Sequence, residues 1–245
     1  MKCIIIGDSI SEGIGSKKMN YENMLLQYCP QLSKIHNLAK TGTTIDYAQN
    51  IIQKIIDNQP DIVIIMYGSV DAQIRPNLKR NRFGICDLIP KRYKIGGMLD
   101  PRAFYSKKWY RIPLDRLDNG IRFILKKIVL MTQGKIQLVN SLNFEKEYEH
   151  IVSLLTEKNI KVVAVSTMYI DDSYFLGSSF EYCKYNSIIE NIAKEYGCAY
   201  VDLYNLTKIM TVQHGWDKLY SHDHFHPNAL GYELIAKTIA KYIDV

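Results

Sequence analysis

The stretch KCIIIGDSISEGIG, residues 2–15, indicates the fold of this chain. Its first part, KCIIIG (2–7), is a short apolar run that is typical of a strand buried on both faces. The letters GDS end the run, and Gly13 and Gly15 in the turn that follows allow a close backbone approach. A buried strand that turns directly into a helix predicts the beginning of an α/β fold.

Strands and helix-period segments alternate along the rest of the chain. Four further strand candidates lie at 34–39, 61–68, 160–168 and 199–204. Between and after them, apolar residues recur at helical spacing within 48–56, 144–155, 185–196 and 230–242. This alternation predicts a mainly parallel five-stranded sheet with helices on both faces. In such folds ligands bind at the carboxyl ends of the strands, near a switch point in strand order.

The composition favours one folded domain over residues 1–245. Apolar residues make up 47% of the chain, which is enough for a substantial core. The five cysteines are an odd number without paired short spacings, which favours free thiols in a reducing compartment. The apolar run at the N-terminus is too short for a signal peptide, and no stretch approaches the length of a membrane span. We therefore expect a cytoplasmic protein.

Residues 73–135 interrupt the alternation and carry most of the positive charge. Sixteen Lys or Arg residues against four acids give this segment a net charge of +12, while the rest of the chain carries −6. Aromatic residues lie among the cations: Phe83, Tyr93, Phe104, Tyr105, Trp109 and Tyr110. So many large side chains indicate a basic, aromatic-rich insertion or lid rather than a linker, with a helix expected at about 117–131.

The insertion begins directly after Asp71, so we expect it to emerge beside the ligand-binding edge of the sheet. A positive, aromatic-lined lid suits a small-molecule or carbohydrate substrate, including an anionic one, because aromatic rings stack on sugars and Arg binds carboxylate or phosphate. The same charge would attract an anionic membrane surface for peripheral contact. Nucleic acid is not expected as a partner, because the sequence contains no nucleic-acid-binding motif.

Candidate catalytic side chains occur at both ends of the chain. Ser9 follows the first predicted strand, and the loop SHDHFHPN (221–228) leads into the last helix and returns to the same edge of the sheet. There His226 can take the proton of Ser9, while Asp223 holds the imidazole and offsets its charge. The pattern predicts nucleophilic catalysis by a serine.

A metal site is the alternative for the same loop. If the loop is extended, His222, His224 and His226 share one face, as metal ligands would. A metal site needs further ligands, however, and no Cys or Glu lies nearby. We favour the proton relay, because Ser9 supplies its nucleophile, and we expect neither a metal nor another cofactor.

These blocks resemble those of the SGNH (GDSL-type) hydrolases over nearly the whole chain. The first block matches at residues 7–9, the second-block glycine corresponds to Gly42, and the last block, Asp-x-x-His, is residues 223–226. The resemblance implies a flavodoxin-like three-layer α/β/α sandwich and activity on esters, often acetyl esters of carbohydrates, without a metal. It also implies Ser9 as nucleophile, His226 as base with Asp223 as its partner, and an oxyanion hole formed by the N–H groups of Ser9 and Gly42.

The third block departs from the family pattern Gly-x-Asn-Asp, because it reads Gly68, Ser69, Val70 and Asp71. Valine cannot supply the third oxyanion donor, and losing one such donor costs about 10²–10³ in rate. Either two donors suffice, or Ser69 or Asn77 replaces the amide, or the protein is not an efficient esterase.

Four more residues are expected to contact the substrate: Asp8, Asp71, Arg75 and His224. The predicted function is an SGNH-type serine esterase that removes or transfers an acyl group, in particular acetyl, on a carbohydrate. One rival is a catalytically weak glycan-binding protein that uses residues 73–135. The other is a metal-dependent hydrolase centred on His222, His224 and His226.

Overall fold

Strand β1 (Lys2–Gly7) lies second in a five-stranded parallel sheet. The computed structural model describes residues 1–16, 20–93, 99–101, 105–106 and 108–243. The other strands of the sheet are β2 (Lys34–Asn37), β3 (Ile62–Met66), β6 (Lys161–Val165) and β7 (Ala199–Val201). The strand order β2-β1-β3-β6-β7 is that of a flavodoxin-like sheet, with its switch point between β1 and β3. The predicted fold class is therefore confirmed, although each predicted strand after the first is longer than the observed one.

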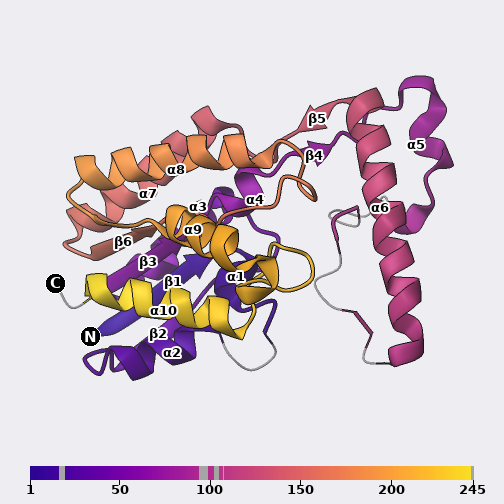
Figure 1. Ribbon diagram of the computed structural model, residues 1–245. Coiled ribbons are helices and arrows are strands. Elements are labelled where there is room, and N and C mark those ends of the chain that lie inside the picture. The colour runs from indigo at the N-terminus through magenta and orange to yellow at the C-terminus, as the bar shows by residue number, and fades with distance from the viewer. Residues whose placement is uncertain (17–19, 94–98, 102–104, 107, 244–245) are drawn as a thin grey trace.

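Helices cover both faces of the sheet and form the outer two of three layers (Figure 1). One face packs against α3 (Ile45–Asp57), α7 (Ser141–Glu157) and α8 (Ser178–Glu195). The other packs against α2 (Tyr21–Tyr28), α9 (Leu203–His214) and α10 (Ala229–Ile243). In β1 the side chains alternate between the two cores, Ile4 and Ile6 on one side and Cys3 and Ile5 on the other, which explains the continuous apolar run. The short helices α1 (Ser9–Glu12) and α4 (Ser69–Ala72) follow β1 and β3.

Residues 75–136 form a separate feature that we call the arm. The chain leaves the body through β4 (Arg75–Pro76) and returns through β5 (Lys135–Ile136), and these two strands pair antiparallel. The arm contains α5 (Ile85–Leu88), α6 (Ile112–Gln133) and 3₁₀ turns at Arg82–Gly84, Lys91–Tyr93 and Trp109–Arg111. Figure 1 shows α5 and α6 to one side of the α/β body. The helix predicted at about 117–131 is present and longer than expected; the predicted basic and aromatic residues Lys94, Arg102, Phe104 and Lys107 lie outside the described residues.

A buried cation ties the arm to the body. Lys126 on α6 is 1% exposed, and its Nζ lies 2.6 Å from Asp100 Oδ1. The same Nζ donates to the carbonyl oxygen of Tyr174, in the body, at 3.1 Å. Because a buried charge without partners is costly, these contacts fix the orientation of α6 relative to the body.

Gly15 brings the turn after α1 against the loop that precedes α10. Its φ is +111°, a conformation that favours glycine, and a Cβ at this position would lie 2.3 Å from the carbonyl oxygen of Pro227. It would also lie 2.9 Å from the Cβ of His226. Only glycine therefore allows the two segments, more than 200 residues apart in sequence, to touch here.

We predict that Gly15→Ala lowers the free energy of unfolding by at least about 3 kcal/mol, because backbone strain and a backbone clash combine. The matched control is Gly197→Ala, since Gly197 has φ +64° but nothing within 4 Å of the added carbon. For this control, the free energy of unfolding is expected to fall only by the roughly 1–2 kcal/mol that the left-handed conformation costs a residue with a Cβ. Urea unfolding of both variants measures the difference, and equal losses would contradict the close contact.

Candidate active site

Ser9 lies at the carboxyl end of β1, as the first residue of α1, and only 4% of it is exposed. Position 7 requires glycine, because a Cβ there would lie 2.7 Å from the backbone carbonyl oxygen of Met66 and 2.7 Å from the Cβ of Ser11. Asp8 caps α1 by accepting the backbone N–H of Ile10 at 2.9 Å. The tight turn thus holds the Ser9 hydroxyl at the edge of the sheet where ligands bind in this fold.

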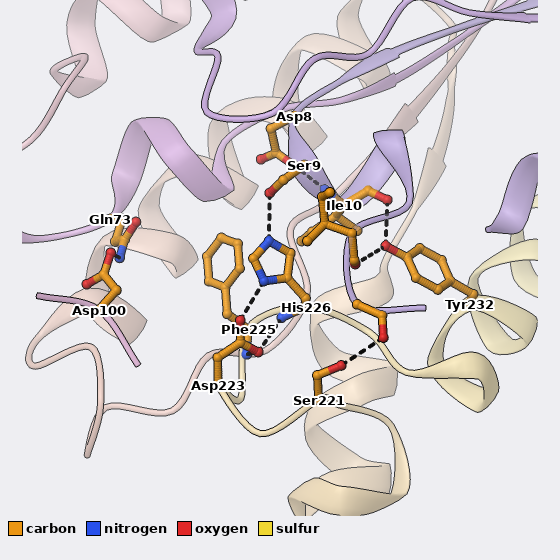
Figure 2. A network of polar contacts seen from close by, with 12 residues as sticks. Asp8, Ser9, Ile10, Gln73, Asp100, Ser221, Asp223, Phe225, His226 and Tyr232 are labelled. Atoms are coloured by element: carbon orange, nitrogen blue, oxygen red, sulfur yellow. Dashed lines mark hydrogen bonds and ion pairs between the residues drawn. The ribbon is translucent and has the colours of Figure 1, made fainter. Parts of the chain in front are cut away.

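A chain of hydrogen bonds connects Ser9 to His226 and Asp223 (Figure 2). Oγ of Ser9 lies 2.9 Å from Nε2 of His226, and Nδ1 of the same ring lies 2.5 Å from Oδ2 of Asp223. The other oxygen of Asp223 accepts the backbone N–H groups of Phe225 and His226 at 3.1 and 3.0 Å. The Asp223 carboxylate is almost fully buried, so it bonds to the imidazole rather than to water and thereby orients the ring. The three side chains singled out in the sequence are therefore brought together.

The segments that carry these residues are held by bonds between the two ends of the chain. Ser221 donates its hydroxyl to the carbonyl oxygen of Gly15 at 3.1 Å. Tyr232 of α10 donates its hydroxyl to the carbonyl oxygens of Ile10 and Ile14, at 3.0 and 2.6 Å (Figure 2). Fixed geometry of this kind keeps the base within hydrogen-bond reach of the nucleophile.

Ser9 opens into a pocket of about 330 Å³. Ser9, Gly42, Val70, Arg75 and His226 line it, and the remaining lining residues are Thr41, Gln73, Asp100, Pro101, Phe175, Asp223 and Phe225. Gly42 belongs to the loop between β2 and α3 and has φ +73°. Three of the arm's residues, Arg75, Asp100 and Pro101, thus form part of the pocket wall.

Neither side chain considered as a replacement for the missing asparagine lines this pocket. Ser69 is buried in α4. Asn77 lies at the start of the arm, where its side-chain oxygen accepts the backbone N–H groups of Lys79 and Arg80 at 3.2 Å. Val70 itself is in the pocket wall and supplies only an apolar surface there.

Arg75 is the cationic side chain among the residues that line the pocket. Its Nη2 donates to Oε1 of Gln73 at 2.9 Å, and Nε2 of Gln73 in turn donates to Oδ2 of Asp100 at 3.1 Å. Nε of Arg75 is buried and has no hydrogen-bond partner within the described part of the chain. A buried N–H without a partner is costly, and an anionic ligand atom in the pocket would satisfy it.

Glu12 was missed by the sequence reasoning. Its carboxylate accepts both the backbone N–H and the hydroxyl of Thr41, so it fastens the loop that carries Gly42 to α1. The position of Glu12 in the first block, GDSISEG, could have indicated a role in the site. Its partner Thr41 lies 29 residues away, however, and is identified only by the fold.

Asp71 and Asp8 lie behind the pocket. Both were expected to contact the substrate, but both are buried and neither lines the pocket. Asp71 is fully buried, and its two oxygens accept the N–H groups of Ile45 and Gly68 at 2.8 and 3.0 Å, which braces the ends of the β2–α3 and β3–α4 loops. Burial raises the pKa of Asp71 to about 7. Burial also raises the pKa of Asp8 to about 6, although N–H groups and the nearby charge of His226 oppose the shift.

His222 and His224 line a second cavity, which shares no lining residue with the Ser9 pocket. Nδ1 of His224 lies 2.6 Å from Oδ2 of Asp171, and its ring stacks on Trp216. His222 stacks on Tyr105. The three histidines therefore do not share one face, and no group of three or more metal-ligating side chains gathers among the residues that the structure describes.

The sequence profile of the GDSL-like lipase/acylhydrolase family matches residues 5–234, and the chain belongs to that family. Family and architecture together define the class of this protein as an ester-bond hydrolase with an α/β/α fold. Among curated proteins, no relative matches the sequence. No helix in the described part of the chain has the length and apolarity needed to cross a membrane.

Solved structures share the whole fold at low sequence identity. One is a variant of Axe2, an acetyl-xylooligosaccharide esterase from Geobacillus stearothermophilus, with 17% identity, a TM-score of 0.64, and coverage of 100% of this chain and 94% of that one. Another is LAE5, an α/β hydrolase from the metagenome of Lake Arreo in Spain, with 18% identity, a TM-score of 0.65 and coverage of 99% and 94%. The acetyl xylan esterase AlAXEase has 16% identity, a TM-score of 0.63 and coverage of 98% of each chain.

We predict that Asp8→Asn stabilises the protein at pH 8 by about 1–3 kcal/mol, because it removes a buried charge while the amide oxygen still caps α1. The pKa of Asp8 is raised on folding from 3.8 to about 6, so the stability contributed by its protonation is present below pH 4 and is lost as the pH rises through 6. The advantage of the variant therefore disappears below about pH 4.

Urea unfolding between pH 4 and pH 8 measures this prediction. Asp171→Asn is a control of opposite sign. Burial alone would raise the pKa of Asp171, but hydrogen bonds from His224 and Ser173 lower it, so this variant is expected to lose stability at pH 8. A pH-independent effect of Asp8→Asn would contradict the assignment.

Proposed function

We propose that this protein is a serine esterase that removes an acetyl group from a carbohydrate through an acyl-serine intermediate. The observation that carries the proposal is the chain of hydrogen bonds from Ser9 through His226 to buried Asp223, at 2.9 and 2.5 Å, opening into a pocket. A nucleophile, a base and a group that orients the base are the three parts that nucleophilic catalysis requires.

The reaction follows from this geometry. Oγ of Ser9 attacks the ester carbonyl while Nε2 of His226 takes its proton, and Asp223 stabilises the resulting imidazolium. The tetrahedral oxyanion accepts N–H groups of Ser9 and Gly42 and collapses to acyl-Ser9, and the leaving alcohol takes the proton from His226. Water then attacks the acyl group by the same route and releases acetate; an acceptor hydroxyl in place of water gives acyl transfer.

Arg75 supplies a hydrogen-bond donor to the pocket, which Val70 cannot. Its guanidinium lines the pocket beside Val70, with a buried Nε that lacks a partner in the described residues. We assign it to the oxyanion of the tetrahedral intermediate, which would satisfy that N–H. This arrangement keeps an esterase role compatible with valine at position 70.

The substrate class rests on three observations. The structural neighbours include esterases of acetylated xylan and xylooligosaccharides, and catalytic mutants of Axe2 replace a serine, an aspartate or a histidine by alanine. The pocket of about 330 Å³ suits a short acyl group with part of one sugar. The second cavity, of about 790 Å³ and lined by Tyr105, Tyr174 and His224, offers aromatic rings to a longer glycan.

We also propose that the protein is cytoplasmic. Cys3, Cys86, Cys183 and Cys198 are free thiols, and Cys3 and Cys86 are buried. Free cysteines of this kind are expected in a reducing compartment.

We predict that Ser9→Ala and Asp223→Asn each lower the release of acetate from acetylated xylooligosaccharides by at least about 10³-fold. Acetate release and binding of the same oligosaccharide are measured in parallel on folded protein. If wild type and both variants bind the glycan equally and none releases acetate, the protein is the glycan-binding protein considered as its rival. Loss of wild-type activity with a chelator would instead favour a metal-dependent reaction.

We predict that Arg75→Gln lowers kcat by about 10²-fold, the usual cost of one oxyanion donor. Val70→Asn in the same chain restores part of the loss, because it provides the family's amide at that position. Arg80→Gln, at an exposed arginine of the arm, is the control and leaves kcat unchanged. A rise in KM without a change in kcat would place Arg75 in substrate binding alone and contradict the oxyanion role.

A further inference from the structure

Helix α6 exposes a regular apolar stripe. Its members are Leu114, Leu117, Ile121, Ile124, Ile128 and Met131, each between 36% and 78% exposed. They follow one another at alternating intervals of three and four residues, the spacing of the a and d positions in a coiled coil. Trp109 and Tyr110 lie just before the helix and are 81% and 53% exposed. No part of the chain that the structure describes covers this face.

Buried charged residues on another face of α6 prevent the helix from rotating its apolar stripe toward the body. Asp118, Arg122 and Lys126 are buried there, together with Gln133. Asp118 accepts the hydroxyl of Tyr93 at 2.6 Å, and Arg122 donates to the carbonyl oxygen of Asp100 at 3.3 Å. Lys126 makes the buried contacts that tie the arm to the body. Rotating α6 to hide its apolar residues would place these charged groups in solvent and break their bonds. The orientation of the stripe is thus set by buried polar contacts.

We propose that the stripe is a dimerisation surface and that its occupant is α6 of a second copy of this chain, related by a two-fold axis. A stripe confined to a and d positions is the seam of a helix pair, narrower than the apolar face with which a helix packs on a core or enters a lipid surface. Gly120 borders the seam and lets two backbones approach closely.

The area of the surface is sufficient for a stable dimer. The six stripe residues with Trp109 and Tyr110 expose roughly 800 Å² per chain, about the area that each partner buries in a standard interface. In a two-fold pair the same patch serves both copies, so no second surface is needed. Interfaces of this size have dissociation constants in the micromolar range or below.

The charge of the arm distinguishes two partners for the stripe, a second copy of the chain and an anionic membrane surface. Two arms of net charge +12 repel each other, and salt screens that repulsion while leaving burial of the stripe intact. The dimer is therefore expected to become tighter as salt rises. Attraction of the same arm to an anionic membrane surface would weaken with salt.

The experiment compares three forms of the full chain. Wild type is measured by sedimentation equilibrium from about 1 to 100 μM, and the expected mass is twice the 28.3 kDa of one chain. Leu117→Glu/Ile124→Glu places charges in the seam and is expected to weaken the dimer by at least about 100-fold, with an unchanged circular dichroism spectrum. Ile209→Glu/Val212→Glu, which changes apolar residues of α9 that are 55% and 74% exposed, is the matched control and remains dimeric.

Three results would overturn the proposal. A wild-type chain that stays monomeric at 100 μM excludes a stable pair. A dimer that survives Leu117→Glu/Ile124→Glu lies on another surface. Binding of monomers to phosphatidylserine vesicles that depends on the stripe and weakens with salt assigns α6 to a membrane surface instead.

Discussion

The hydrogen bond between Oγ of Ser9 and Nε2 of His226 joins the two ends of the chain and sets the main constraint on the structure. It requires the turn after β1 and the loop before α10 to meet at one edge of the sheet. Gly15 permits that contact because it has no Cβ, and Tyr232 anchors α10 to the carbonyl oxygens of the first turn. Closing the site therefore depends on nearly the whole fold, as the match to the family over residues 5–234 also implies.

The arm is connected to the pocket as well as to the body. Asp100 accepts from Gln73 in the pocket wall and pairs with Lys126 of α6, while Gln73 accepts from Arg75. Polar contacts thus run from the proposed oxyanion side of the pocket to the helix that carries the exposed stripe. If two copies pair through α6, the pairing stabilises a helix whose other face holds one wall of the pocket.

The sequence was sufficient to predict the mainly parallel five-stranded sheet, the basic insertion with its helix, and the meeting of Ser9 with His226 and Asp223, because these depend on hydrophobic period and on a rule about sheet edges. The flavodoxin-like arrangement was expected only from the resemblance to the SGNH hydrolases. It could not separate polar residues that face the pocket from those behind it. Asp71 follows a strand just as Ser9 does, but its carboxylate turns inward to two backbone N–H groups. Glu12 acts on the loop that carries Gly42 through its bond to Thr41. The apolar stripe of α6 is exposed because Lys126 forms a buried ion pair with Asp100. Both effects depend on partners that are distant in sequence.

We propose that His226 and Asp223 activate Ser9 as a nucleophile. Intact-mass analysis after reaction with a fluorophosphonate probe tests it most directly, since the probe requires an activated hydroxyl and no knowledge of the substrate. We predict a single adduct on wild type, none on Ser9→Ala, and strongly slowed labelling of Asp223→Asn. A folded wild-type protein that takes up no adduct, or an adduct that persists in Ser9→Ala, would contradict it.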